Sequence, residues 1–144
     1  MADKDDILKL LRDQEAAVAR GDAAGVVAPM DDDYVLFDLP PPLVHRGDAA
    51  QGEAALNDWF ASWKDGVTVA LRDPQVTVSG NLAAVYGLSR MRGTKKDGGS
   101  VDNWSRRTVV LAKRDGAWRM IHEHNSFPTK MDGSGASAMD LKPE

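Results

Sequence analysis

From Val67 to Phe127 the chain alternates apolar and polar residues almost without interruption. Because successive side chains of a β-strand point to opposite faces, this pattern predicts a series of half-buried strands. Three short segments, 79–81, 96–99 and 114–117, divide the pattern, and their Gly, Asn and Asp residues are typical of hairpin turns. We expect consecutive strands to pair antiparallel, at 67–71, 75–79, 82–92, 101–113 and 118–127.

The first half of the chain has helical periodicity instead. Apolar residues recur at helical spacing from Asp5 to Arg20, and Gly21 is a natural end for this helix. A short helix is expected at 22–28 and a third at 48 to about 64, where Gly52 weakens the first turns. One strand, at 34–38, lies between them. Three helices followed by a meander predict an α+β domain with its helices on one face of the sheet.

Length and composition allow one domain. The chain has 144 residues, of which 42% are hydrophobic, and this suffices for a single core. We expect the domain to span 1–129 and the aperiodic segment 130–144 to be a flexible tail. A polar N-terminus and the lack of an apolar run of about 20 residues predict a soluble, cytoplasmic protein without a membrane partner. A net charge of −4 without a basic stripe argues against nucleic acid, and the absence of cysteine excludes thiolate sites.

The segment Arg114–Pro128, RDGAWRMIHEHNSFP, carries the strongest family signal. It resembles the closing hairpin of SnoaL-like domains and of the calcium/calmodulin-dependent kinase II association domain. Gly21-Asp22 and Val35–Asp38 ahead of His45–Gly47 resemble the same families, which include ketosteroid-isomerase-like proteins of the nuclear transport factor 2-like superfamily. The resemblance covers 7–128. It implies a cone-shaped fold, with three N-terminal helices packed on a strongly curved antiparallel or mixed sheet around a small-molecule pocket.

Asp38 is the first candidate for chemistry. It follows an apolar strand, so its carboxyl can face the space beneath the helices, where burial raises the pKa of an acid. By position it resembles the carboxylate with which ketosteroid isomerases move a proton. The alternative is that Asp38 only ends the strand and hydrogen-bonds a turn. The oxyanion-binding tyrosine and neutral acid of those isomerases are not matched here, where Gln14 and Thr108 stand near their positions.

Arginines provide the candidate positive charge. Arg90 matches by position a pocket arginine of the kinase association domain, whose two other pocket arginines are not kept. Arg107 can restore a second charge, and such bidentate donors suit a carboxylate or an enolate oxygen. We expect one face of the strand at 82–92, including Tyr86, Arg90 and Arg92, to line the pocket. The alternative for each arginine is a solvated sheet edge.

The last strand presents two different faces. Glu123 and Asn125 are expected inside, where Glu123 either pairs with an arginine or acts as a second acid or base. His122 and His124 have the spacing of metal ligands, but a structural or interface role is favoured, and we expect no metal. Aromatic side chains that can serve as pocket walls, or alternatively as plain core, are Tyr34, Trp59, Trp63 and Trp104.

These features predict a small-molecule-binding protein that transfers a proton on a hydrophobic carbonyl compound without a cofactor. Asp38 is the expected base, and Arg90 or Arg107 holds the negative charge. Isomerase, cyclase and dehydratase chemistry all stay open. The alternative is a non-catalytic association or sensing module that binds a carboxylate, with Asp38 ionised against Arg90. Both alternatives predict a homodimer through the outer sheet face.

Overall fold

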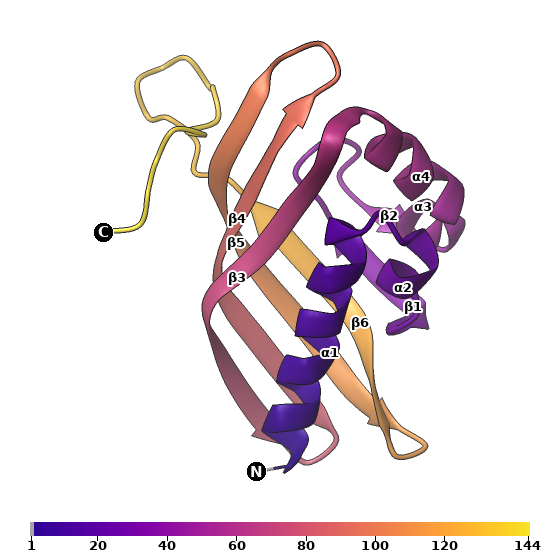
Figure 1. The fold of residues 1–144 in the computed structure, drawn as a ribbon. Coiled ribbons are helices and arrows are strands. Elements are labelled where there is room, and N and C mark those ends of the chain that lie inside the picture. Colours follow the sequence, from indigo (N-terminus) through magenta and orange to yellow (C-terminus); the bar gives the residue numbers. More distant parts are fainter. Residues whose placement is uncertain (1) are drawn as a thin grey trace.

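The computed structural model describes residues 2–144, apart from the side chains of Asp48 and Ala49. A long first helix lies across one face of a six-stranded sheet, and the shorter helices gather beside its C-terminal end (Figure 1). The elements are, in chain order, α1 (Ala2–Ala19), α2 (Ala23–Val27), β1 (Met30–Phe37), β2 (His45–Arg46), α3 (Asp48–Gln51), α4 (Glu53–Ala61), β3 (Trp63–Ser79), β4 (Leu82–Lys95), β5 (Ser100–Arg114) and β6 (Ala117–Ser126).

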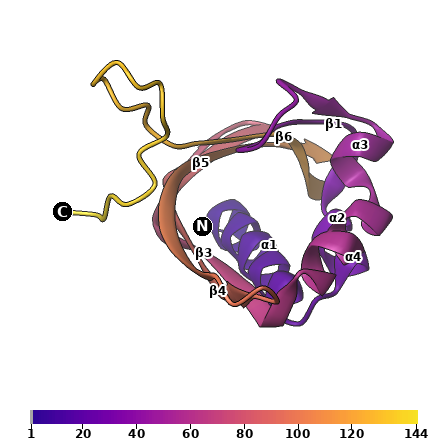
Figure 2. The same cartoon turned by 90° about the horizontal axis from the view of Figure 1, so that it is seen from above.

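The sheet has the strand order β2-β1-β6-β5-β4-β3. Strands β3 to β6 pair antiparallel, as the hairpin turns predict, whereas β1 pairs parallel with β6 and makes the sheet mixed. The face covered by α1 is called the inner face below, and the opposite one the outer face (Figure 2). The α+β class is thus confirmed. The strands pass around α1, but the sheet stays open between β2 and β3 and does not curl as strongly as expected.

The helices follow from local signals. Gly21 adopts φ 69°, a left-handed conformation that glycine takes without strain, and it ends α1. Asp22 then caps α2, because its carboxylate accepts a hydrogen bond of 3.0 Å from the Gly25 N–H. The third expected helix is divided at Gly52, which has an extended backbone, and α4 ends at Ala61. Trp63 was expected on this helix and instead begins β3.

One long strand, β3, replaces the two strands expected at 67–71 and 75–79. Its pairing with β4 is irregular between Arg72 and Gln75, where Asp73 has φ 46° and Pro74 provides no N–H. Pro74 is tolerated because β3 is an edge strand of the sheet. The turn residues therefore mark a local irregularity here and not the end of a strand.

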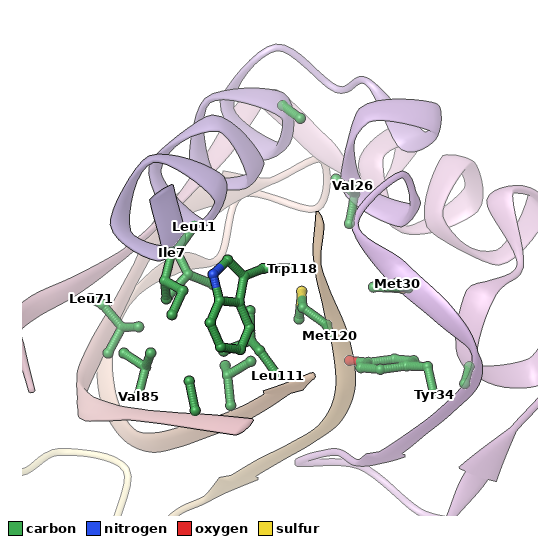
Figure 3. Close-up of a cluster of buried hydrophobic side chains, with 14 residues drawn as sticks. Ile7, Leu11, Val26, Met30, Tyr34, Leu71, Val85, Leu111, Trp118 and Met120 are labelled. Atoms are coloured by element: carbon green, nitrogen blue, oxygen red, sulfur yellow. The ribbon is translucent and has the colours of Figure 1, made fainter. Parts of the chain in front are cut away.

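The core lies between α1 and the inner face of the sheet. Ile7 and Leu11 of α1 are buried against side chains of β3 to β6, with Trp118 at the centre of the cluster (Figure 3). Figure 3 also shows Tyr34 reaching inward from β1, with its hydroxyl directed toward the interior. The fully buried members with large side chains are Tyr34, Ile7, Leu111, Met120, Val67, Val85 and Val109. The core is thus apolar around Trp118, and the hydroxyl of Tyr34 is a polar group at its border.

The segment after β6 leaves the sheet on its outer side (Figure 2). It forms a small loop that is closed by two backbone hydrogen bonds, from Lys130 to Ala136 (2.8 Å) and from Ala138 to Pro128 (2.7 Å). Ala138 is buried, whereas most other residues of 130–144 are exposed. The segment thus has local order without a helix or strand of the main sheet.

Candidate functional site

A buried ion pair between Arg107 and Glu123 stands at the centre of the inner face. Arg107 lies on β5 and Glu123 on β6, and their side chains meet through two hydrogen bonds, from Nε to Oε2 and from Nη2 to Oε1, each 3.0 Å. Both residues are buried. Because removing one partner of such a pair leaves an unbalanced charge in the interior, the pair requires additional polar neighbours.

Those neighbours come from three other positions. Gln14 of α1 accepts a hydrogen bond of 3.0 Å from Arg107 Nη2 and donates another, of 2.9 Å, to the Val26 carbonyl. Tyr34 Oη donates to Glu123 Oε1 at 3.1 Å, and Asn125 Nδ2 donates to Glu123 Oε2 at 2.8 Å. Glu123 therefore accepts four hydrogen bonds in all. The network ties α1, β1, β5 and β6 together beneath the helices.

The protonation states of this network follow from its contacts. Burial by itself raises the pKa of Glu123, but the charge of Arg107 and the donated hydrogen bonds outweigh burial and hold that pKa below its ordinary value. Burial raises the pKa of the Tyr34 hydroxyl well above its ordinary value, so this group stays a neutral donor. Arg107 and Glu123 are consequently both charged near neutral pH and balance each other.

Asp38 lies at the end of this network. Its Oδ1 accepts a hydrogen bond of 2.8 Å from the Leu39 N–H and a longer one, 3.5 Å, from Asn125 Nδ2. Burial raises the pKa of Asp38, and the nearby negative charge of Glu123 raises it further, while the Leu39 hydrogen bond acts in the opposite direction. Among the described residues no Lys, Arg or His forms a salt bridge with Asp38. The carboxyl is thus half-buried, close to a second carboxylate and without a salt bridge to a described residue.

A surface groove of about 740 Å³ reaches Asp38 from outside. The β1–β2 loop, with its three consecutive prolines, forms most of the wall, and Phe37, Arg46 and His124 complete it. Asp38 belongs both to the lining of this groove and to the interior network. The structure thus places a residue of raised pKa in the wall of an accessible, largely apolar depression.

Five of the sequence-predicted site residues therefore come together: Tyr34, Asp38, Arg107, Glu123 and Asn125. Four others, Tyr86, Arg90, Arg92 and Trp104, lie on the outer face. On β4 the buried residues are Ala83, Val85 and Ser89, so the alternate positions point away from α1.

The expectation that Arg90 lines the pocket is accordingly wrong. Arg90 donates two hydrogen bonds to the Asp102 carboxylate, from Nε at 2.9 Å and from Nη2 at 2.8 Å, and it lies over the Trp104 ring at 5.5 Å. Its partners are thus on the outer face, and Glu123 pairs with Arg107 alone. Small residues occupy the inner face of β4 because the packing is tight there: a Cβ on Gly87 would lie 2.8 Å from Leu71 Cδ2.

Trp59 and Trp63 lie apart from the carboxylate network. Their rings meet edge to face at 5.8 Å, and Lys95 Nζ lies 3.9 Å from the Trp63 ring centroid. Trp63 is buried and Trp59 half-buried. The pair packs where α4 meets β3, which is the arrangement of an aromatic core.

Two residues of this region are absent from the sequence-predicted site. Gln14 stands where the isomerase tyrosine was sought, and its amide serves Arg107 instead of a ligand. His45 lies on β2, a strand of two residues that no sequence pattern predicts. Gln14 could have been identified from the sequence as a polar residue on the buried face of a helix. For His45, the only indication in the sequence was the match to the family motif.

Two further observations concern the part of the chain that the structure describes. Within it, no cluster of three or more His, Cys, Asp or Glu side chains could hold a metal ion. No helix in residues 2–144 is long and apolar enough to cross a membrane.

Comparison with protein families gives a match over most of the chain. The model of the SnoaL-like domain matches residues 7–130. A nuclear transport factor 2-like protein of unknown function from Pseudomonas putida KT2440 is 30% identical, with a TM-score of 0.86 over 99% of this chain and 97% of that one. A comparison with curated proteins returns no match.

Two other solved structures carry descriptions of a role. A protein from Xanthomonas campestris, provisionally described as a calcium/calmodulin-dependent protein kinase II association domain, is 25% identical, with a TM-score of 0.70 over 83% of this chain and 84% of that one. A protein from Novosphingobium aromaticivorans, provisionally described as an aromatic ring hydroxylase, is 21% identical, with a TM-score of 0.74 over 87% and 88%. The second similarity shows a shared fold and nothing more.

Proposed function

The chain belongs to the SnoaL-like domain family, within the nuclear transport factor 2-like superfamily, and on this premise we propose that it binds a small neutral carbonyl compound and transfers a proton on it with Asp38. A family of this kind does not fix an activity, since one fold carries many functions. The proposal rests on one observation above all: Asp38 has a raised pKa, forms no salt bridge with a described residue, and belongs to the lining of a groove.

The environment of Asp38 suits a general base. A carboxylate without a balancing cation in a half-buried site holds a proton more strongly than one in water, and this brings its basicity closer to that needed at neutral pH. Asp38 would take a proton from the carbon next to the carbonyl group. The electron pair of that C–H bond would form a C=C bond, and the carbonyl oxygen would become an enolate oxygen. Return of the proton to another carbon completes an isomerisation.

Because the charge of Arg107 is balanced within the network, a neutral ligand suits this site better than a carboxylate. Its guanidinium is balanced by Glu123 and hydrogen-bonded to Gln14, so no uncompensated cation of this network faces an incoming anion. Ionised Asp38 would also repel an anionic ligand. These contacts disfavour the carboxylate-sensing module relative to proton transfer.

We further propose that two copies pair through the outer face. This face exposes Tyr86 at 55% and Leu88 at 38% on β4, and Phe37 is 37% exposed on β1; such apolar surface favours association. Sedimentation equilibrium of the wild-type protein and of Tyr86→Lys tests the proposal. A dimer that the charged variant disrupts supports it, whereas a wild-type monomer at high concentration refutes it.

The proton-transfer proposal is tested with 3-cyclohexen-1-one, whose isomerisation to the conjugated ketone increases ultraviolet absorbance. We expect the wild-type protein to accelerate this reaction and Asp38→Asn to abolish the acceleration. Asp33→Asn is the matched control, because Asp33 lies on β1, the strand that precedes Asp38, and has an exposed side chain. If Asp38→Asn retains full activity, or if Asp33→Asn loses as much activity as Asp38→Asn, the assignment of Asp38 as the base is wrong.

A further inference from the structure

His45 carries a buried ring nitrogen that no described residue engages. The Nε2 atom of His45 has no hydrogen-bond partner, and it is one of two such buried side-chain atoms in the described part of the chain, the other being Trp63 Nε1. A buried polar atom without a partner costs free energy, so structures that keep one commonly reserve it for a ligand or a reaction. Nothing in the carboxylate network described above uses this atom.

The backbone places His45 beside Asp38. His45 pairs with Leu36 across β2 and β1, and Asp38 follows Leu36 by two residues, so both side chains extend from the same side of this sheet edge. Val44 and Arg46 line the groove together with Asp38, whereas His45, which alternates with them, extends toward the side on which Asp38 meets Asn125. His45 is also among the groups whose charge offsets the rise that burial causes in the pKa of Asp38. Two independent observations thus bring an imidazole next to the candidate base.

We propose that His45 is the second ligand-contacting group of the site, with Nε2 donating a hydrogen bond to the oxygen on which negative charge develops. This inference rests on the proposed function and adds the group that function lacks. Arg90, the expected holder of that charge, lies on the outer face, and Arg107 is balanced by Glu123. A donor aimed at a developing oxyanion stabilises it most where water is excluded, which is the situation of a buried Nε2.

The ligand class follows from this arrangement. An acceptor oxygen near His45 and a transferable proton near Asp38 fit an enolisable ketone or a phenol. 4-Nitrophenol is a suitable probe, because it has a single hydroxyl and its absorbance separates the phenol from the phenolate. We expect binding to move the His45 side-chain nitrogen signals in a long-range ¹H–¹⁵N spectrum and to leave those of His122, which lies outside the groove lining, in place.

Variants separate the role of the nitrogen from that of the ring. His45→Phe keeps a ring of similar size and should weaken probe binding about tenfold, the effect of one lost hydrogen bond. His45→Gln restores an N–H donor and should keep binding within about threefold of wild type. His122→Phe is the matched control and should bind the probe as wild type does, because His122 lies outside the groove lining and its ring contacts the Val35 carbonyl. Thermal melts establish that each variant is folded.

Each outcome decides the proposal. A shifted His45 signal together with the loss in His45→Phe supports it. A second outcome is that the probe binds, that Asp38→Asn alters its affinity and that His45→Phe does not. In that case His45 is not a ligand-contacting group, and the proposed function stands. If 4-nitrophenol does not bind the wild-type protein at all, the assigned ligand class is wrong, and the ketone assay with Asp38→Asn judges the function separately.

Discussion

Replacing Glu123 by glutamine should destabilise the fold by about 3–5 kcal/mol, because it leaves the charge of Arg107 buried without a counter-charge. The two side chains are only 8% and 12% exposed, so water cannot take over the role of the carboxylate. The change is nearly isosteric. The loss therefore reports charge and hydrogen bonding, with little contribution from packing.

The contacts of Glu123 allow the loss to be worked out. Its two oxygens accept from Arg107 Nη2 and Tyr34 on one side, and from Arg107 Nε and Asn125 on the other. A glutamine has one acceptor oxygen, so in either orientation its NH₂ group faces an N–H of Arg107. At least one hydrogen bond to a charged group, about 1.5–3 kcal/mol, is thus replaced by a donor–donor contact, in addition to the unbalanced charge.

Urea unfolding followed by tryptophan fluorescence measures this loss. The matched control is Asp102→Asn, which breaks the exposed outer-face pair with Arg90 and should cost only about 0–1 kcal/mol. Removing both interior charges, with Arg107→Met and Glu123→Leu together, should be less harmful than Glu123→Gln alone. A Glu123→Gln variant within 1 kcal/mol of wild type, by this measurement, would refute the reasoning.

The pH dependence has a defined sign. The pKa of Glu123 is lower in the folded protein than its ordinary value of 4.5, so its stabilising contribution is complete above that value. The contribution is lost as the pH falls through the folded pKa. The difference in stability between wild type and Glu123→Gln should therefore be constant at neutral pH and shrink as the pH falls below 4.5.

Three further changes have definite expectations. Tyr34→Phe removes one donor from Glu123 and should cost about 1–2 kcal/mol in urea unfolding, and an unchanged midpoint would contradict its role. The pKa of Asp38 is raised in the folded state, so its ionisation opposes folding as the pH rises above the ordinary value of 3.8. The thermal stability of Asp38→Asn relative to wild type should accordingly increase as the pH rises above 3.8, and a decrease would be the contrary result. Gly93→Ala places a Cβ 2.7 Å from Trp63 Cε3 and should destabilise by about 1–3 kcal/mol, whereas a neutral effect in thermal melts would show that the ring can move.

Much of the candidate site was predictable because the spacing along a strand is local information. Glu123 and Asn125 are two residues apart on β6, so alternation puts them on one face, and burial of a carboxylate requires a cationic neighbour. Arg90 and Arg107 were both candidates for the cation that balances Glu123. The register of β5 against β6 selected Arg107, which pairs with Asn125, and no property of the isolated sequence contains that register.

The error on β4 has a physical cause. Alternation predicts two faces but does not say which one turns inward, and the larger apolar residues, Leu82, Tyr86 and Leu88, pointed to the wrong side. The structure packs Leu71 closely against Gly87, so the inner face of this strand accepts only small or moderate side chains. The large residues and Arg90 were therefore left on the outer face.

The sequence by itself determined the hairpins, the helical first half and the α+β class, because turn chemistry and periodicity act over a few residues. It also determined which charged residues had to be balanced if buried. Only the tertiary structure decided which arginine balances Glu123, which face of β4 turns inward, and that His45 lies beside Asp38. Those outcomes depend on contacts between segments that are distant in the sequence. The free energy of such a buried contact depends on both partners, which meet only when the chain folds.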